Sequence, residues 1–418
     1  MAASSSASSH FLAGKKIIVA GAGLGGLSFI LALHKQWTST SSSLGSPSPP
    51  IITVYERDKK LAGLLREGYS LSIRSDGLSG GMQALHKLGL LEAMLRVSIA
   101  STKGDQGAFV IWDKTWKEVL KIKAQTSDKD LLAPSMRIAR KALREVLIDA
   151  VPPHVNMQWE TTCTGVVQLG NGRVQVQLSN EEADECDLLI AADGANSQIR
   201  ACLRPDDTLS FTGAVCIGGR AKFSNGLPAP VDKKWGTVIG ARGTGLFASP
   251  LDEQSAVWSL SYLASEPREK VQGFGDQLLQ EALDRGRVIA QPFKTLVQAT
   301  DVSNVGIYNA KDKAPFPHIE KKGTLKHGNV IFIGDSNHAM SPFAGNGANM
   351  ALMDGWELAN ELCKSNSLLA AVTAYDLLSL PRSKRAIRTS HWSITMAHAQ
   401  GWKLIFCLLV LKLIVIII

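Results

Sequence analysis

Residues 15–33 read KKIIVAGAGLGGLSFILAL, and they decide the fold because a strand, a glycine-rich turn and a helix follow one another. Residues 16–20 are predicted to form a buried strand and residues 24–33 a helix. The G-x-G-x-x-G between them has Gly21 for the tight turn, Gly23 for close approach to a pyrophosphate and Gly26 for close helix packing. Free N–H groups at such a helix start bind phosphate. The stretch therefore predicts a dinucleotide-binding unit.

An acidic residue stands at the end of the next predicted strand. Residues 51–55 form that strand and Glu56 follows it. A carboxylate in this place can bind the hydroxyls of an adenosine ribose. Glu56 comes 30 residues after Gly26, where about 20 residues is usual. The Ser/Pro-rich residues 37–50, WTSTSSSLGSPSPP, explain the excess, and we expect them to form an exposed loop.

The composition is that of a globular protein, with 418 residues, 45% of them hydrophobic, and a net charge of +8. Lysine and arginine form no block and no stripe interleaved with aromatic residues, so no nucleic-acid binding is expected. Six scattered cysteines without a C-x-x-C pattern favour reduced thiols and a cytoplasmic setting over disulfides or a metal site. Residues 1–13 lack the features of a secretory signal and are expected to form a disordered tail.

The C-terminal residues 404–418, LIFCLLVLKLIVIII, are apolar apart from Lys412 and follow Trp402-Lys403, a pair typical of membrane interfaces. As a helix they measure ~22 Å, short of the ~30 Å hydrocarbon core. The alternatives are a buried terminal helix and a β-prone tail. We favour association with a membrane, on its cytoplasmic side, because the segment has no polar face to meet water.

Two further predicted strands end in an acidic residue next to a glycine. Residues 187–192 lead into Asp193-Gly194, and residues 329–333 lead into Gly334-Asp335. Each alone is an ordinary strand and turn. A carboxylate at a strand end can accept hydrogen bonds from sugar-like hydroxyls; the alternative for Asp335 is a helix cap or a loop carboxylate.

The residues after Asp335, SNHAMSPFAGNGAN, are predicted to form a shaped loop that opens a helix from about residue 347 to 363. Gly345 and Gly347 expose backbone N–H groups without side-chain obstruction, so an anionic ring oxygen could rest at this helix start. His338 is interpreted as a structural histidine, since the sequence shows no catalytic partner for it.

In this order and spacing, GAGLGG, IARKALREVL, DLLIAADGANSQIR and GDSNHAMSPFAGNGAN resemble the single-component FAD-dependent aromatic-ring hydroxylases, the group A flavoprotein monooxygenases. GYSLSIRSDGLSGGMQALHKLGLLEAM makes the chain most similar to the branch with tetracycline-degrading and salicylate-hydroxylase-like enzymes. The resemblance covers residues 15–390. It implies an α/β fold: a Rossmann-type, glutathione-reductase-like FAD-binding domain with an inserted β-sheet substrate domain and a C-terminal helical region.

The resemblance also implies roles for single residues. Glu56 would bind the adenosine ribose, Arg140 would contact the flavin side of the cofactor, and Asp193 belongs to a motif linked to FAD and NADPH handling. Asp335 would bind the ribityl and pyrophosphate region. The backbone at the edge of the isoalloxazine ring would come from Gly347, Ala348 and Asn349. No acid or base for catalysis can be assigned.

The predicted organisation is a tail (1–13), an FAD-binding domain (14–205, with 101–130 on the substrate side, and 327–390), a substrate sheet (206–326), and a C-terminal helix and tail (391–418). Alternating apolar residues in 211–223 and 245–263 indicate strands. The aromatic residues of this region are interpreted as core rather than pocket: Trp235, Phe247, Trp258 and Tyr262.

The main hypothesis is a monooxygenase that uses FAD, NADPH or NADH, and O₂. The family mechanism implies a C4a-hydroperoxyflavin that hydroxylates or epoxidises an apolar aromatic or a polyketide-, terpenoid- or alkaloid-like molecule of secondary metabolism. One alternative is a flavin oxidase or dehydrogenase on the same fold, because the motifs specify FAD more tightly than oxygen chemistry. Another is a non-catalytic flavin-binding membrane protein. The oligomeric state is left open.

Overall fold

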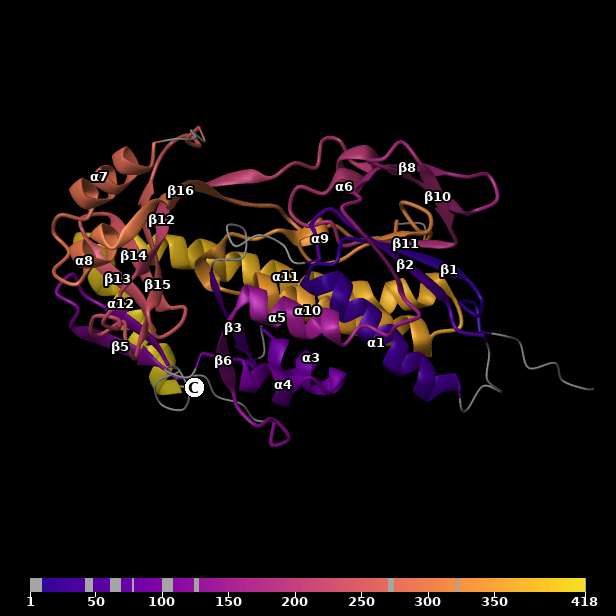
Figure 1. The fold of residues 1–418 in the computed structure, drawn as a ribbon, viewed down its shortest axis with the longest axis horizontal. Coiled ribbons are helices and arrows are strands. Elements are labelled where there is room, and N and C mark those ends of the chain that lie inside the picture. Colours follow the sequence, from indigo (N-terminus) through magenta and orange to yellow (C-terminus); the bar gives the residue numbers. More distant parts are fainter. Residues whose placement is uncertain are drawn as a thin grey trace, which may run out of the picture.

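The computed structural model describes residues 10–41, 48–60, 69–76, 79–99, 108–123, 128–269, 274–320 and 323–417. Figure 1 shows two lobes, one around β1, β2 and β11 and the other around β12–β16, with long helices running between them. The strands are β1 (Lys16–Ala20), β2 (Ile51–Glu56), β3 (Ser70–Arg74), β4 (Phe109–Trp112), β5 (Glu118–Ile122), β6 (Ser135–Ala139), β7 (Asn156–Trp159), β8 (Cys163–Gln168), β9 (Val174–Leu178), β10 (Ala183–Cys186), β11 (Leu188–Ala191), β12 (Ser210–Lys222), β13 (Trp235–Ala241), β14 (Thr244–Pro250), β15 (Ser255–Leu263), β16 (Thr300–Asp312) and β17 (Val330–Phe332). The helices are α1 (Leu24–Ser41), α3 (Gly81–Leu88), α4 (Leu91–Arg96), α5 (Arg140–Asp149), α6 (Gln198–Leu203), α7 (Gly275–Arg285), α8 (Phe293–Gln298), α9 (Asp335–His338), the 3₁₀ turn η3 (Pro342–Ala344), α10 (Gly347–Lys364), α11 (Leu368–Ala397) and α12 (Gly401–Ile417).

The first lobe is built on a parallel sheet whose described strands have the order β17-β11-β1-β2-β7. Successive side chains of a strand point to opposite faces. On one face Ile17 and Val19 join the core of α1, α5 and α10. On the other face Ile18 and Ala20 pack against the small antiparallel sheet β8–β10. The parallel sheet is therefore covered on both sides, which explains why its strands are continuously apolar.

Helices α1 and α10 pack closely although their sequences lie far apart. A Cβ atom on Gly355 of α10 would lie 2.6 Å from the Gly25 carbonyl oxygen of α1. Ser28 of α1 also donates a hydrogen bond to the carbonyl of Leu352, at 2.6 Å. This contact fixes the start of α10 next to the glycine-rich turn before α1.

The second lobe holds a larger, mostly antiparallel sheet, with the described order β16-β12-β15-β14-β13-β4-β5. Leu246 and Ala248 of β14 face α7 and α8, and with neighbouring strands they form a second hydrophobic core. Phe247 and Ser249 alternate with them and therefore point to the opposite face, which we call the inner face. The inner face is turned toward the first lobe, since Ser249 Oγ lies 3.3 Å from Ser70 Oγ of β3.

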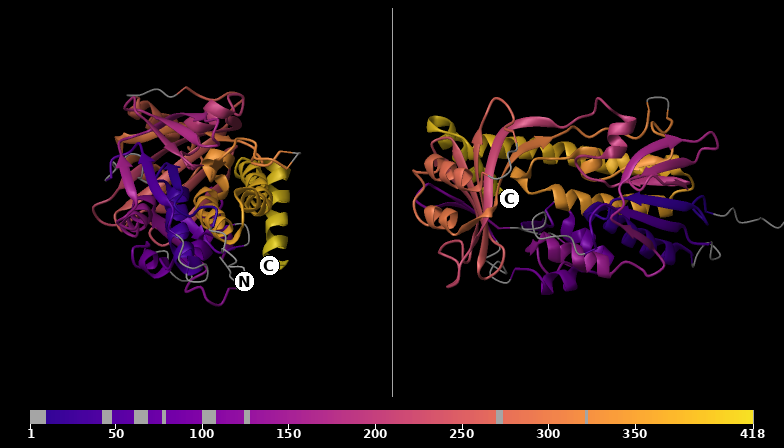
Figure 2. Two further views of the ribbon diagram at one scale, coloured as in Figure 1. Left: turned by 90° about the vertical axis from the view of Figure 1, so that its right-hand side faces the viewer. Right: turned by 45° about the horizontal axis from the view of Figure 1, so that its top comes forward.

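Helix α11 joins the two lobes. It packs against α10 in the first lobe, against η3, and against β13 and β14 of the second lobe (Figures 1 and 2). Helix α12 follows it and lies beside the second sheet, where Cys407 is buried with Ile111 and Ile239. The predicted fold class is confirmed: an α/β fold with a Rossmann-type parallel sheet, an inserted sheet and a helical C-terminal region.

Two local expectations are wrong. Helix α1 continues to Ser41, so the first part of the expected loop 37–50 is helical, and Trp37 is buried against His10 with ring centroids 5.0 Å apart. Residues 10–13 of the expected tail are packed, with Leu12 in the core of the first lobe. In both places one apolar side chain finds a place in the core, which outweighs the polar composition around it. Residues 1–9 and 42–47 lie outside the described residues.

Candidate functional site

The turn between β1 and α1 has the geometry that its three glycines predict. Gly21 has a φ of +103°, and a Cβ atom there would lie 2.5 Å from the Ala192 carbonyl oxygen. A Cβ on Gly26 would lie 2.1 Å from the Gly21 carbonyl oxygen, whereas a Cβ on Gly23 would meet nothing within 4 Å. Gly21 and Gly26 therefore close the turn, while Gly23 faces open space where a phosphate can approach.

Glu56 lies at the end of β2 and is buried beside that turn. Its Oε2 accepts a hydrogen bond from the Ala22 N–H at 2.7 Å, and its Oε1 accepts one from the Asp58 N–H at 2.9 Å. Buried Arg144 of α5 places its Nη2 3.5 Å from Glu56 Oε2 and donates from Nε to the Ala22 carbonyl at 3.1 Å. The carboxylate is thus oriented and charge-paired, and it keeps lone pairs for ribose hydroxyls.

Sequence reasoning missed Arg144, although a signal was present. It stands four residues after Arg140 on α5, so both side chains leave the helix on similar sides. An arginine among the apolar positions of a short helix indicates a buried acidic partner. Glu56 is that partner.

Asp193 follows β11 and forms the second acidic corner. Its Oδ2 accepts a hydrogen bond from the Ile199 N–H at 3.2 Å, while its buried Oδ1 has no hydrogen-bond partner among the described residues. Burial raises the pKa of Asp193, against the opposing hydrogen bonds from Ser197 and the backbone. Arg200 connects this corner to the next, because its Nη1 donates to the Ser336 carbonyl at 2.8 Å.

Asp335 follows β17 and forms the third acidic corner. Its Oδ1 lies 3.9 Å from where a Cβ on Gly347 would stand, so it meets the start of α10. Burial raises the pKa of Asp335, and the charges of His338, Arg140 and Arg200 oppose that rise. Arg140 and Asp335, nearly 200 residues apart in sequence, therefore lie close enough for their charges to interact.

His338 has a clear structural role, as the sequence interpretation proposed. Its Nε2 lies 2.6 Å from Oδ2 of fully buried Asp354, which also accepts the Gly334 N–H at 2.8 Å. On the other oxygen of Asp354, Arg382 of α11 donates from Nη2 at 2.7 Å. This buried network connects β17, α10 and α11 directly behind Asp335.

The start of α10 is fixed by side chains from β3. The Asn349 side chain accepts the Arg74 N–H at 2.8 Å and donates to the Ser72 carbonyl at 2.8 Å. Arg74 in turn donates to the Asn346 side chain and to the Ala344 carbonyl. Gly347, Ala348 and Asn349 form the first turn of α10. Their N–H groups have no hydrogen-bond acceptor within the helix. They are available to an anionic ligand.

The inner face of the second sheet carries aromatic and hydroxyl side chains near this loop. Phe343 of η3 packs against Ala214 and Ala310, and so connects the loop to that face. The Tyr308 hydroxyl of β16 reaches across β12 to Ser259 Oγ of β15, at 3.1 Å. Gly218 of β12 lies between these strands. The Tyr308 side chain is 36% exposed, and burial around its hydroxyl, with Cys216 beside it, raises its pKa, so the hydroxyl keeps its proton.

Of the four aromatic residues interpreted as core, three are buried. Trp258 and Tyr262 belong to the core under α7 and α8. Trp235 is buried on the inner face, and only Phe247 is partly exposed there, with the two rings 6.4 Å apart. The alternation of strand residues could separate the two pairs, but which face is core depends on helices that lie later in the chain.

Arg137 of β6 is a buried cation at the contact between the lobes. It stacks on Trp235, with its guanidinium carbon 4.3 Å from the ring centroid, and donates to Ser249 Oγ at 2.9 Å. Burial lowers its pKa to about 9, and repulsion from Arg74 adds to this effect. Its Nε has no hydrogen-bond partner among the described residues. The Arg137 side chain therefore connects β6 of the first lobe to β13 and β14 of the second.

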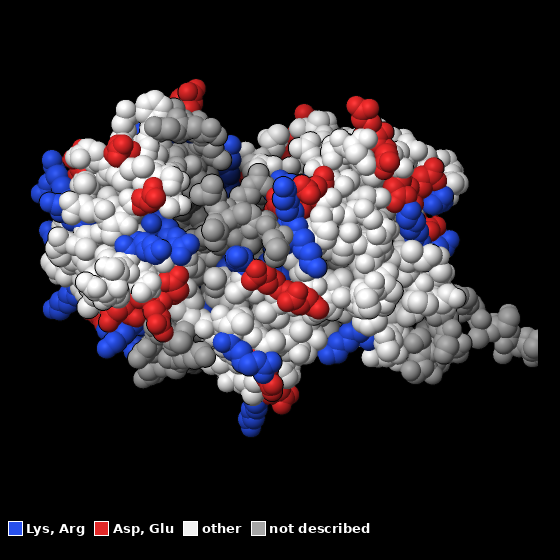
Figure 3. Space-filling model, in the orientation of Figure 1, with Lys and Arg blue, Asp and Glu red and all other residues white. Residues whose placement is uncertain are grey.

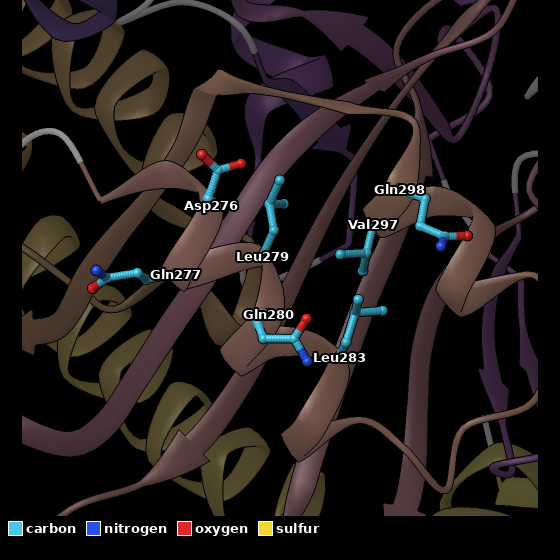
Figure 4. Close-up of a pocket in the computed structure, with 7 residues that line it drawn as sticks. All are labelled: Asp276, Gln277, Leu279, Gln280, Leu283, Val297 and Gln298. Carbon is cyan, nitrogen blue, oxygen red and sulfur yellow. The ribbon is translucent and has the colours of Figure 1, made fainter.

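A separate depression of about 460 Å³ lies between α7 and α8, on the outer side of the second sheet, as Figure 4 shows. Leu279, Leu283 and Val297 form its apolar part, and acidic and amide side chains surround them. None of the acidic corners contributes to it, so it is not the candidate site.

The surface in Figure 3 carries lysine, arginine, aspartate and glutamate side chains interspersed, without a large region of one sign on that face. Among the described residues, no group of three His, Cys, Asp or Glu side chains could hold a metal ion. All six cysteines lie in the described part and are free thiols. Within that part no helix combines the length and the apolar character that crossing a membrane requires.

The arrangement fits an FAD molecule. Parallel strands bring Gly21, Glu56, Asp193 and Asp335 to one edge of the sheet, as a dinucleotide site requires. A Cβ atom on Gly23 or Gly194 would meet nothing within 4 Å, so this edge has open space at both turns. Asp193 Oδ1, which no described residue contacts by a hydrogen bond, offers a further acceptor for a hydroxyl. These observations define the class: an α/β dinucleotide-binding protein with a second sheet next to the far end of the site.

Comparison with known proteins gives the family. Residues 16–367 match the model of the FAD binding domain, and the chain belongs to this family. A monooxygenase of Aspergillus candidus, cfoF, is 40% identical over 402 residues, covering 93% of both chains. The chloroplastic zeaxanthin epoxidase of Spinacia oleracea is 27% identical over 357 residues, 84% of this chain and 48% of the epoxidase. Klebsiella pneumoniae HpxO, solved with FAD and uric acid, shares the fold with a TM-score of 0.73 and 20% identity, covering 93% of this chain and 90% of that one.

The family predicted from the sequence is confirmed, and so is FAD as the cofactor. The chain is an FAD-dependent monooxygenase of the hydroxylase and epoxidase type, an oxidoreductase whose reactants are O₂ and a small molecule.

Proposed function

We propose that this monooxygenase takes electrons from NADPH or NADH and inserts one oxygen atom into an apolar aromatic, polyketide-, terpenoid- or alkaloid-like molecule, in secondary metabolism. The observation that supports the proposal is the inner face, which carries Phe247 and the Tyr308–Ser259 pair and on which Phe343 of the loop before α10 packs. A planar apolar ring with a hydroxyl or carbonyl group matches an aromatic wall with a hydrogen-bonding pair.

We propose that the FAD is held by the residues that the sequence singled out: Gly21, Gly23, Gly26, Glu56, Arg140, Asp193, Asp335, Gly347, Ala348 and Asn349. When bound, the flavin supplies the redox and oxygen-transfer chemistry. The chain's own residues position the cofactor and the substrate. First-turn N–H groups of α10 favour negative charge at the ring edge, and the second lobe excludes water from it.

Residues 14–205 and 327–390 are proposed as the FAD-binding domain and 206–326 as the substrate domain. Strands β4 and β5 extend the second sheet, which supports the assignment of 101–130 to the substrate side. The proposal keeps the enzyme on the cytoplasmic side of a membrane, with residues 404–418 in contact with that membrane.

A flavin oxidase or dehydrogenase on the same fold is the alternative, because the proposed FAD-binding residues specify the cofactor rather than oxygen transfer to a substrate. Anaerobic reduction by NADPH and by NADH, followed by mixing with O₂ and a library of small aromatics, separates the two. We expect faster flavin reduction when a substrate is bound, and a product heavier by one oxygen atom. Hydrogen peroxide as the sole oxygen product with every compound would establish the oxidase reading. If neither NADPH nor NADH reduces the flavin in the presence of any compound, the result would support a non-catalytic flavin-binding protein.

A further inference from the structure

Helix α12 has two faces with different surroundings, although its sequence is apolar apart from Lys403 and Lys412. One face packs on the second sheet: Cys407 is buried with Ile111 and Ile239, and Leu404 lies 3.1 Å from where a Cβ on Gly240 would stand. Since this face holds α12 against the domain, the helix lies along the protein surface (Figures 1 and 2).

The opposite face of α12 is exposed and apolar. Its side chains follow the i, i+3, i+4, i+7 spacing of one helix side. Their exposed fractions are 72% for Trp402, 62% for Ile405, 61% for Phe406, 56% for Leu409 and 59% for Leu413. A contiguous apolar face of this kind on a soluble surface marks an interaction site.

The charged side chains of the sequence after Asp376 have one sign. Asp376 is the last acidic residue of the sequence, and the residues after it include Arg382, Lys384, Arg385, Arg388, Lys403 and Lys412. Lys384, Arg385 and Arg388 are exposed on one side of α11, and none of them forms an ion pair with a described residue. Lys403 is exposed beside Trp402, with its Nζ 5.9 Å from the ring centroid.

We propose that the exposed face of α12 docks on the surface of an anionic lipid bilayer, with the helix lying in the plane of the interface. An apolar helix face enters the boundary between headgroups and acyl chains, with a tryptophan at headgroup level. Cations of α11 and Lys403 then attract anionic headgroups. The uncompensated positive charge favours lipid over a second copy of this chain, because two such surfaces repel each other.

The test is flotation of the full-length, FAD-loaded protein with vesicles of phosphatidylcholine, with and without phosphatidylserine. Wild-type protein is expected to float with both, and more strongly when phosphatidylserine is present. In Phe406→Glu/Leu409→Glu we expect at least about tenfold weaker partition, because two charges must enter the interface. FAD content stays unchanged, since neither side chain packs on the fold.

A matched control carries the same charge change at sites of similar exposure elsewhere. Ile51→Glu/Leu132→Glu replaces side chains that are 60% and 63% exposed, and it should float like the wild type. Arg385→Gln/Arg388→Gln should weaken binding about fivefold per removed cation on phosphatidylserine vesicles and leave binding to phosphatidylcholine unchanged.

Wild-type protein that stays at the bottom with both vesicles overturns the proposal, as does equal flotation of the Phe406→Glu/Leu409→Glu variant. Sedimentation of the same samples without lipid gives a third outcome. A wild-type dimer that the double substitution converts to a monomer, without flotation in either form, would assign the face to a second copy. Docking of α12 extends the membrane contact of the proposed function; because flotation measures no turnover, a negative result removes that contact and leaves the oxygen-insertion proposal intact.

Discussion

The cofactor edge of the parallel sheet and the inner face of the second sheet were recognisable from sequence to very different degrees. The cofactor edge is built from short contiguous stretches, such as residues 21–26 and 334–335, whose backbone forms the turns and offers N–H groups to a ligand. The inner face consists of single side chains from β12, β14, β15 and β16, and its orientation depends on α7 and α8 covering the other face. Backbone-built sites leave motifs, whereas sites built from alternating side chains do not.

The difference also predicts how the two regions respond to substitution. The cofactor edge is supported by buried charges and by contacts with no spare volume, so changes there should affect stability and FAD binding. The inner face is partly exposed at Phe247 and Tyr308, so changes there should affect ligand affinity and leave the fold unchanged.

The largest effect is expected for Asp354→Asn behind the cofactor edge. Loss of the charge leaves Arg382 and its network buried without this partner, which costs about 3–5 kcal/mol of the free energy of unfolding. Urea unfolding of the FAD-loaded protein measures the change. Wild-type stability in the variant would show that the network is not needed to support Asp335.

The same residue gives a pH dependence. Burial alone raises the pKa of Asp354, but His338, Arg382 and the Gly334 N–H outweigh it and hold the pKa far below its ordinary value. Its stabilising contribution is therefore complete above the unfolded-state pKa of about 4, and it is lost as the pH falls toward the lower folded-state pKa. Urea unfolding below pH ~4 should show a smaller loss of stability in Asp354→Asn than in the wild type.

The next largest effect is a loss of stability that should occur on substitution of Gly26 but not of Gly23, two glycines of one motif. Gly26→Ala forces a methyl group to 2.1 Å from the Gly21 carbonyl, so we expect a loss of about 3 kcal/mol in stability. Gly23→Ala meets no protein atom within 4 Å and should unfold like the wild type in the apo form, yet bind FAD more weakly. Thermal unfolding of both apo proteins, with FAD titration by fluorescence, tests this. Equal destabilisation by the two substitutions would contradict the assigned geometry.

Glu56→Gln should weaken FAD binding by about 1.5–3 kcal/mol, the contribution of a hydrogen bond to a charged group. The amide keeps one acceptor oxygen but loses the charge opposite Arg144. Glu92→Gln is the control, since its side chain is 75% exposed. If equilibrium dialysis gives the same FAD affinity for both, Glu56 supports the turn and not the ribose.

The smallest effect is expected on the inner face. Tyr308→Phe removes one neutral hydroxyl and should weaken substrate binding by about 1 kcal/mol, roughly fivefold, with unchanged FAD content and stability. Tyr262→Phe removes a hydroxyl on the core side, where Arg268 donates to it at 3.1 Å, and should leave substrate binding unchanged. Flavin difference spectra during substrate titration give both affinities. A weaker affinity in Tyr262→Phe alone would place the substrate elsewhere.

Features that depend on neighbouring residues in the sequence could be predicted, whereas features that depend on contacts between distant residues could not. The strand, turn and helix around Gly23, and the acidic strand ends at Asp193 and Asp335, depend on neighbours in sequence and could be predicted. Arg144 pairs with Glu56, 88 residues earlier, and Phe247 faces inward because Leu246 meets α7 and α8. Such contacts depend on the assembled fold. Trp37 shows the same limit, since a Ser/Thr-rich stretch stays helical when one tryptophan is buried.

The cofactor edge and the inner face are proposed to perform oxygen insertion together. Turnover of the FAD-loaded protein under ¹⁸O₂, with NADPH or NADH consumption recorded and the product analysed by mass spectrometry, tests this most directly. We expect one ¹⁸O atom in the product for each nicotinamide nucleotide oxidised in the coupled reaction, and a lower coupled fraction in Tyr308→Phe. Nucleotide oxidation that yields labelled hydrogen peroxide and an unlabelled organic product, across all substrates that accelerate flavin reduction, would contradict it.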